Sequence, residues 1–340
     1  MKRIGPLLAL FGLLSTPGAP LPAQAVTIKL ATLVPERSVW GNVLREMGAE
    51  WKEATNGRVT LRMYPGGVAG DDPDVVRKMR IGQLQAGTLT LTGLTEIDSA
   101  FNVFGIPLFF DSYEEYFYVL ERLEPVLKER LASKGYVFLH WGHGGWVHLF
   151  SSEPVMTVER LRQQKLFVWA GSDRMVRWWK DNDFRPVPLA LTDVVTALQT
   201  GMIEAMPSTP LVTLSFQWYR TTPNMLAMGF GPFLGATVVT KAGWNRLSPA
   251  DKEAILASAA DAAERFRIEI PAQDADAIAE MEKRGLTVNE VNDPVALAAW
   301  QEAAEMFAAN MRETFVPPDI YDLAIKAREE FRGRAGAETP

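Results

Sequence analysis

The chain has 340 residues, of which 47% are hydrophobic and 22% are charged, and it contains no cysteine. This balance is typical of a folded protein with about two domains, and it argues against a disordered chain. The net charge of −6 disfavours a nucleic-acid-binding protein. The lack of cysteine excludes disulfides, thiolate metal sites, cysteine nucleophiles and cysteine-linked lipids.

The first 25 residues have the three parts of a secretory signal peptide. Met1-Lys2-Arg3 is cationic, residues 4–14 are apolar, and Ala23-Gln24-Ala25 is a small-residue cleavage site. The apolar run is about half as long as the roughly 20 residues that a transmembrane helix needs. We therefore expect cleavage after Ala25 and a soluble, exported mature protein, with an uncleaved membrane anchor as the less favoured alternative.

Strand and helix patterns alternate in the first part of the mature chain. Two-residue periodicity predicts strands at residues 26–30, 58–64, 89–91 and 136–141. Helical spacing of apolar residues predicts helices at 38–52, 71–79 and 114–131. This alternation is typical of an α/β domain with a largely parallel sheet.

A second unit of the same kind follows. We expect strands at 165–169, 185–187, 203–206 and 236–240, and helices at 173–180 and 193–200. Ser248 followed by Pro249 is a favourable helix start, and the helical pattern continues to Arg284 with one interruption at Pro271. At about 1.5 Å per residue this helix would be roughly 54 Å long, so we expect it to span both units and to bend at Pro271.

The last part of the chain is also helical. We expect helices at 294–313 and 319–331, and frayed ends over residues 333–340.

Two clusters could suggest a metal site, and we favour another interpretation for both. His140, His143 and His148 lie close together in the sequence, but they lack the helical H-E-x-x-H pattern. We expect a turn with packed or hinge-lining imidazoles there. The three aspartates of residues 71–74 lack the Gly and Glu of an EF-hand loop, so we expect helix capping.

No motif in the chain indicates an enzyme. The sequence has no G-x-S-x-G, no Walker loop and no G-x-G-x-x-G that opens a helix. Aromatic residues are instead concentrated between Tyr136 and Phe184, at about twice their average density in the chain. Such clusters form cores more often than pockets, although tryptophan is well suited to a ligand cleft.

Six segments, in order along the chain, resemble one protein family. They are LATLVPERSVWG (30–41), GGVAGDDPDVVRKMRIGQLQAG (66–87), FGIPLFFDSYEEYFYVL (104–120), TVERLRQQKLFV (157–168), ALTDVVTALQTGMIEA (190–205) and TVVTKAGWNRLSPADKEAI (237–255). Together they resemble the solute-binding proteins of TRAP transporters, the DctP-like family. No single segment is diagnostic, but six in order cover about 300 residues.

This resemblance implies the two-lobed α/β fold of periplasmic binding proteins, with a long helix that spans both lobes. It places residues 26–145 and about 237–270 in lobe I, and residues 146–236 and about 271–332 in lobe II. The protein would capture a small organic solute in the periplasm and deliver it to TRAP permease subunits in the membrane. It would need no cofactor or metal and would not be an enzyme.

The chain departs from the family at three positions that usually hold the solute. Phe167 stands where most members have an arginine that pairs with the solute's carboxylate, and Val147 replaces a second arginine. Met206-Pro207-Ser208 stands where the family has Gln-Glu-Asn. Every one of these changes removes a charge or an amide group.

The departures favour a largely apolar solute. A buried carboxylate needs a fixed cation, and a phenyl ring cannot supply one. We expect the walls of the site to be Phe167, Trp169 and Trp146, with Met206 and Ser208 opposite.

Two alternatives remain open at this point. One is a carboxylate receptor in which Arg37, Arg174 or Arg177 takes the place of the missing arginine. The other is a periplasmic sensor or interaction protein with the same fold.

Overall fold

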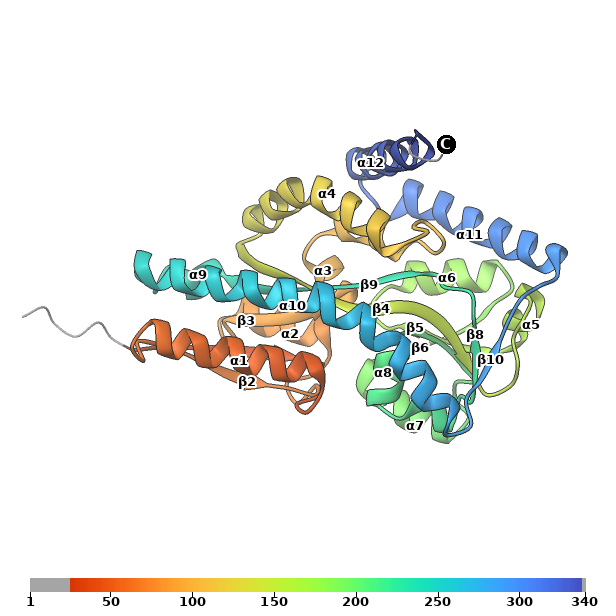
Figure 1. The fold of residues 1–340 in the computed structure, drawn as a ribbon, viewed down its shortest axis with the longest axis horizontal. Helices are drawn as coiled ribbons and strands as arrows, with labels where there is room; N and C mark the ends of the chain where they lie inside the picture. Colours follow the sequence, from red (N-terminus) through yellow and green to blue (C-terminus); the bar gives the residue numbers. More distant parts are fainter. Residues whose placement is uncertain (1–24, 338–340) are drawn as a thin grey trace, which may run out of the picture.

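The computed structural model describes residues 25–337, and its helices surround one mixed β-sheet (Figure 1). The strands are β1 (Val26–Thr32), β2 (Val59–Tyr64), β3 (Ala86–Thr90), β4 (Tyr136–Ser151), β5 (Lys165–Trp169), β6 (Arg185–Leu189), β7 (Ala205–Ser208), β8 (Asn224–Leu226), β9 (Gly231–Thr240) and β10 (Thr287–Asn289). The expected signal peptide falls on residues that lie almost wholly outside this described range.

The helices follow the predicted order closely. They are α1 (Val39–Ala54), α2 (Asp72–Arg80), α3 (Leu91–Ile97), α4 (Tyr113–Ser133), α5 (Val158–Gln163), α6 (Asp173–Asp181), α7 (Val194–Gln199), α8 (Pro210–Ser215), α9 (Lys241–Trp244), α10 (Pro249–Glu282), α11 (Pro294–Thr314) and α12 (Pro318–Ala337). Helices α3, α8 and α9 were not expected, and α12 continues well into the segment for which frayed ends were expected. Within the described range, no helix is long and apolar enough to cross a membrane.

The sheet consists of two parallel groups of strands that are joined by antiparallel pairs. Its order is β2-β1-β3-β9-β4-β7-β5-β6, with β8 and β10 beside β4. Strand β1 is parallel to β2 and β3, and β5 is parallel to β6 and β7, whereas β9 is antiparallel to β3 and β4. The expected largely parallel sheet is therefore wrong at its centre. The physical reason is that β4 and β9, which join the two parallel groups, run antiparallel to each other and to their neighbours β7 and β3.

The histidine segment does not form the expected turn. Residues 140–148 lie within the continuous strand β4, which has an irregular register between His143 and Trp146 where it pairs with β9. Glycine is common both in turns and at β-bulges, and here Gly145 adopts a φ of 104° at the bulge. The strand thus pairs with β9 over its first part and with β7 over its last part.

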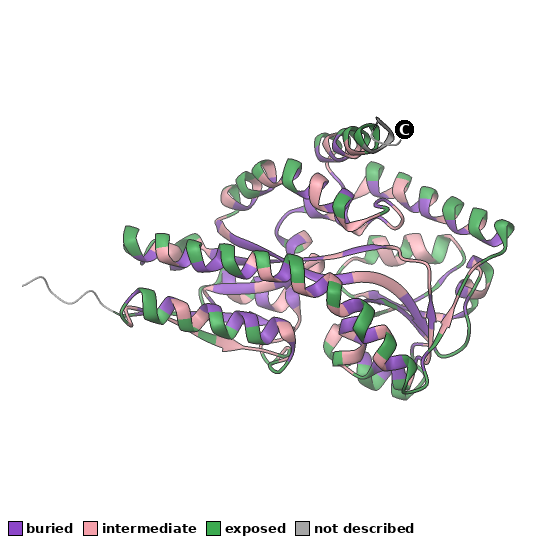
Figure 2. Cartoon of the chain, in the orientation of Figure 1, coloured by how far each residue is buried: buried purple, intermediate pink, exposed green. Residues whose placement is uncertain are grey.

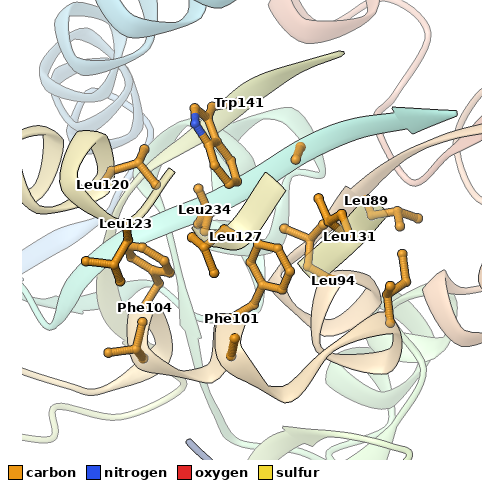
Figure 3. Packing of buried hydrophobic residues seen from close by; sticks show 14 of the residues in the cluster. Leu89, Leu94, Phe101, Phe104, Leu120, Leu123, Leu127, Leu131, Trp141 and Leu234 are labelled. Atoms are coloured by element: carbon orange, nitrogen blue, oxygen red, sulfur yellow. The ribbon is translucent and has the colours of Figure 1, made fainter. Parts of the chain in front are cut away.

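Two apolar layers cover the first lobe's part of the sheet. On one side, Val43, Met47 and Trp51 of α1 are buried together with Phe266 of α10. On the other side, four leucines of α4 belong to one buried cluster with Phe101 and Phe104, and Figure 3 shows them as Leu120, Leu123, Leu127 and Leu131. Figure 2 shows the same pattern along the helices, whose buried faces turn inward while their outer faces are exposed. The predicted spacing of apolar residues in α1 and α4 therefore matches the faces that are buried.

Helix α10 connects both lobes. It has 34 residues with Pro271 in its interior, and the Ser248 hydroxyl accepts a hydrogen bond from Asp251 N at 3.1 Å at its start. Figure 1 shows α10 running from beside α1 across β4 to α8. The prediction of an α/β fold with a long helix that spans both lobes is confirmed.

Candidate functional site

A cavity of about 100 Å³ lies between the two lobes. Residues at the carboxyl ends of β1 and β3 form its first side, the middle of β4 and β9 forms its back, and the second lobe covers it with β5, β7 and α8. In open α/β sheets, ligands bind at the carboxyl ends of parallel strands. This cavity is therefore the candidate functional site. Seven aromatic side chains contribute to its lining: Trp40, Phe167, Trp169, Phe216, Trp218, Phe233 and Phe266.

The lining carries no charge at neutral pH. Within the part of the chain that the structure describes, no Asp, Glu, Lys or Arg lines the cavity. Among residues 25–337, the one titratable side chain of the lining is His143, and its burial, together with nearby His140 and Arg267, lowers its pKa to about 3. The Nδ1 atom of His143 lies 3.1 Å from the Tyr116 hydroxyl in the core. The imidazole is therefore neutral.

Most hydroxyl groups of the lining are already bonded within the protein. The Thr90 hydroxyl donates to Asp72 Oδ2 at 2.6 Å, and the Thr209 hydroxyl donates to the Gly144 carbonyl at 2.5 Å. The Ser208 hydroxyl donates to the Thr209 carbonyl at 3.3 Å. These groups can still accept or share a hydrogen bond, but the protein itself uses much of their capacity.

A buried carboxyl group supports one wall of the cavity. Asp72, in the first turn of α2, is 0% exposed and accepts hydrogen bonds from the backbone N–H and the hydroxyl of Thr90. Burial raises the pKa of Asp72 to about 7. The expected capping role holds for Asp71, whose Oδ1 accepts from Asp72 N at 2.9 Å. Asp72 instead fixes the strand end that carries Thr90.

The structure shows no cluster of metal ligands in the range 25–337. No group of three His, Asp or Glu side chains there is arranged to hold a metal ion. His140 and His148 each place Nδ1 within 3.1 Å of a backbone carbonyl, of Trp141 and Leu226 respectively. The three imidazoles are packed, as expected, although not in a turn.

Four of the eight predicted site residues line the cavity. They are Phe167, Trp169, Met206 and Ser208. Phe167 packs edge-on against Trp169 with ring centroids 5.5 Å apart, and it is 1% exposed. The family resemblance singled out Phe167, Met206 and Ser208, and the aromatic cluster included Trp169. Strands β5 and β7, which carry them, both contribute to the lining of the cavity.

Trp146 and Val147 are not among the residues that line the cavity. The Trp146 ring packs edge-on against Tyr113 of α4 with centroids 5.0 Å apart. The expectation that Trp146 forms a wall of the site therefore stays a prediction. The bulge in β4 between His143 and Trp146 changes which face of the strand the following side chains occupy.

None of the candidate arginines reaches the cavity either. Arg37 and Arg177 are exposed, and neither contributes to the lining. Arg174 donates to the Thr314 carbonyl at 3.3 Å, and its guanidinium lies over the Phe315 ring. It faces the end of α11, so the proposed relocation of a family arginine finds no support in this geometry.

Several lining residues escaped the sequence analysis. Trp40 lies in the 30–41 segment that carried the family resemblance, so it could have been proposed as a site residue from the sequence. Phe233 and Phe266 had no signal of their own, since they reach the cavity only because β9 and α10 cross behind it.

The carboxylate of Asp274 on α10 accepts hydrogen bonds from residues of three other elements, β4, α4 and α8. Asp274 Oδ2 accepts from Trp146 N at 2.7 Å and from the Tyr113 hydroxyl at 3.2 Å. Asp274 Oδ1 accepts from Leu211 N of α8 at 3.2 Å. Burial raises the pKa of Asp274 to about 6. Strand β4 and helices α4, α8 and α10 are thereby joined at one point.

Comparison with known proteins agrees with this architecture. The family model for bacterial extracellular solute-binding proteins, family 7, matches residues 30–314. A solute-binding protein of Chromohalobacter salexigens is 26% identical over 299 residues, which are 86% of this chain and 87% of that protein.

Two solved structures share the fold. An extracytoplasmic solute receptor of Bordetella pertussis that binds pyroglutamic acid has a TM-score of 0.82 at 18% identity, covering 90% of this chain and 100% of that one. A TRAP periplasmic solute-binding protein of Chromohalobacter salexigens with bound D-glucuronate has a TM-score of 0.80 at 24% identity, covering 89% and 99%. The chain belongs to family 7 of the bacterial extracellular solute-binding proteins, and it is a periplasmic solute receptor of the TRAP type.

Proposed function

We propose that this receptor captures a small, uncharged and largely apolar organic solute in the cavity between its lobes and delivers it to TRAP permease subunits. The observation that carries the proposal is the lining of the cavity. It combines seven aromatic side chains with no Asp, Glu, Lys or Arg side chain from the described part of the chain.

The energetics of desolvation support this choice of solute. A carboxylate that is enclosed in the cavity would lose its water, at a cost of several kcal/mol unless a cation replaces the hydration. An apolar solute gains about 25 cal/mol for each Å² of surface that it buries. Phe167 in the middle of β5 offers an apolar surface and no positive charge. The lining therefore favours the apolar solute.

The size of the cavity limits the solute to a compact molecule. Its volume of about 100 Å³ is smaller than the roughly 150 Å³ of an engineered apolar cavity that binds benzene. A single ring or a short branched chain is the size class that fits the conformation described here, and opening of the lobes would admit larger molecules.

An organic acid is the second candidate, and the related receptors favour it. The proteins compared above hold pyroglutamic acid and D-glucuronate, both of which carry a carboxylate. These relatives give no support to an apolar solute. An acid in this cavity would have to rely on hydroxyl and backbone N–H groups, because Arg37, Arg174 and Arg177 all lie elsewhere.

Mass spectrometry of the purified receptor separates the two candidates. The protein is isolated from the periplasm without denaturation, and the compound released from it is identified and then added back in a thermal-shift assay. We expect an uncharged, largely apolar compound that raises the melting temperature. Release of an organic acid that stabilises the protein equally well would overturn the proposal in favour of the second candidate.

We also propose the lobe boundaries that the family resemblance implied. Lobe I comprises residues 26–145 and about 237–270, and lobe II comprises 146–236 and about 271–332. The positive φ of Gly145 and the proline at position 271 support the crossing points in β4 and α10. Limited proteolysis and mobility measurements on labelled protein would test whether the segments move as these two units.

A further inference from the structure

The first turn of α2 contacts the second lobe at the edge of the cavity. Asp71 Oδ2 accepts a hydrogen bond from Leu191 N at 2.9 Å, although the two residues are 120 positions apart. Leu191 itself lines the cavity and begins a 3-10 helix (Leu191–Asp193) that follows β6. Beside this bond, a β-carbon built on Gly67 would lie 2.8 Å from the methyl carbon of Thr192. The two lobes therefore meet closely here.

The same turn of α2 is connected to the wall of the cavity. Asp71 uses its other oxygen, Oδ1, to accept from Asp72 N, so its carboxylate bridges its own helix and the second lobe. Asp72 in turn holds the backbone and hydroxyl of Thr90, which lines the cavity. A shift of Thr90 would thus be transmitted through two adjacent residues to the contact with Leu191.

We infer that Asp71 is the latch of this receptor: its carboxylate holds lobe II against lobe I through Leu191 N–H, and Asp72 couples this latch to the cavity wall at Thr90. The inference rests on the proposed function, a receptor that closes over its solute. Hydrogen bonds to an ionised acceptor are stronger than neutral ones. Loss of this bond should raise the ratio of open to closed protein by roughly tenfold.

Spin-label distance measurements test the latch directly. The chain has no cysteine, so two introduced cysteines give clean labelling. Ile81 and Met202 are suitable positions, because they belong to opposite lobes and are 60% and 52% exposed. In the protein as purified from the periplasm, we expect the wild-type chain to show a short distance that corresponds to the closed form. Asp71→Ala should transfer a large part of this population to a longer distance.

A second variant removes the same bond from the other side. Leu191→Pro deletes the donor N–H, and proline is tolerated at the first position of a helix. The preceding Ala190 has a φ of −72° and a ψ of 150°, which is compatible with a following proline. This variant should show the same shift and leaves the cap of α2 intact, so a folding defect of Asp71→Ala would not prevent the test.

Asp74→Ala is the matched control. Asp74 lies in the same turn of α2 but pairs only with Arg77, at 2.8 Å, among the described residues. It should leave the distance distribution unchanged. Wild-type distributions in both Asp71→Ala and Leu191→Pro would overturn the inference. Identification of an acidic solute would refute the proposed solute class, but it would not affect the spin-label test of the Asp71–Leu191 contact. Failure of the solute proposal and failure of the latch can therefore be distinguished.

Discussion

Gly145 in β4 lies directly against the carboxylate of Asp274 in α10. A β-carbon built on Gly145 would lie 2.3 Å from Asp274 Oδ2, and the residue has a φ of 104°. Two independent constraints therefore require glycine at this position. The contact joins β4 to α10 just behind the cavity. A change in the angle between the lobes would alter this contact.

Gly145→Ala should destabilise the protein strongly. The positive φ alone costs about 1–3 kcal/mol for a residue with a side chain, and the clash with Asp274 adds to this. Gly285→Ala is the matched control, because Gly285 has a φ of 101° but nothing within 4 Å of its β-carbon position. Urea unfolding of both variants measures the difference. Equal losses of free energy of unfolding would show that the contact with Asp274 is unimportant.

Phe167→Arg should change the class of solute that the receptor binds. The guanidinium would stand at the cavity wall, so binding of an apolar solute should fall at least tenfold, while binding of small carboxylates should become measurable. Val147→Arg adds the same charge at a position that is not among the lining residues, and it should leave solute binding nearly unchanged. Titration calorimetry with the copurified compound and with a panel of small acids gives both affinities. Unchanged affinity in Phe167→Arg would exclude Phe167 from the site.

The buried aspartates should make the stability of the protein depend on pH. Burial raises the pKa of Asp72 to about 7, so between about pH 4 and pH 7 the folded chain binds more protons there than the unfolded chain. The stabilising contribution is full below pH 4 and is lost as the pH rises, by up to about 1.4 kcal/mol per pH unit. Asp274, with a pKa raised to about 6, acts in the same direction.

Asp72→Asn isolates this effect. His140 and His143 have pKa values lowered by burial and act in the opposite direction, so the wild-type curve alone is not diagnostic. The free energy of unfolding should fall less steeply between pH 4 and pH 7 in Asp72→Asn than in the wild-type protein, as measured by urea unfolding at several pH values. Asp74→Asn, at a half-buried position of the same helix, should follow the wild-type curve. A wild-type slope in Asp72→Asn would contradict the raised pKa.

Phe101→Ala should show how much the core beneath α4 contributes to the free energy of unfolding. Phe101 is fully buried among the leucines of α4, and its ring packs edge-on against Trp141 with centroids 6.3 Å apart (Figure 3). Its loss should cost about 3–5 kcal/mol of free energy of unfolding. Leu256→Ala on the exposed side of α10 should change stability by less than about 0.5 kcal/mol. Chemical denaturation measures both, and a small loss for Phe101→Ala would indicate that the core collapses to fill the space.

The sequence by itself determined the order and type of most elements, and its resemblance to one family indicated the two-lobed α/β class. The elements depend on local physics: the spacing of apolar residues in α1 and α4, the capping residue Ser248 and the alternation at the start of β1. Phe167 could be assigned to the site from the family resemblance, and Trp169 lies two residues further along the same strand. The departure of Phe167 from the family pattern was also visible without a structure.

Only the tertiary structure decided which distant segments meet. The antiparallel centre of the sheet, the contact of Trp146 with Tyr113 and the contact of Arg174 with Thr314 all depend on neighbours far along the chain. The same holds for Phe266, which lines the cavity because α10 crosses behind it. Local periodicity predicts only which face of a single element is buried. A cavity forms where the faces of several elements meet, and the packing of the lobes decides where that happens.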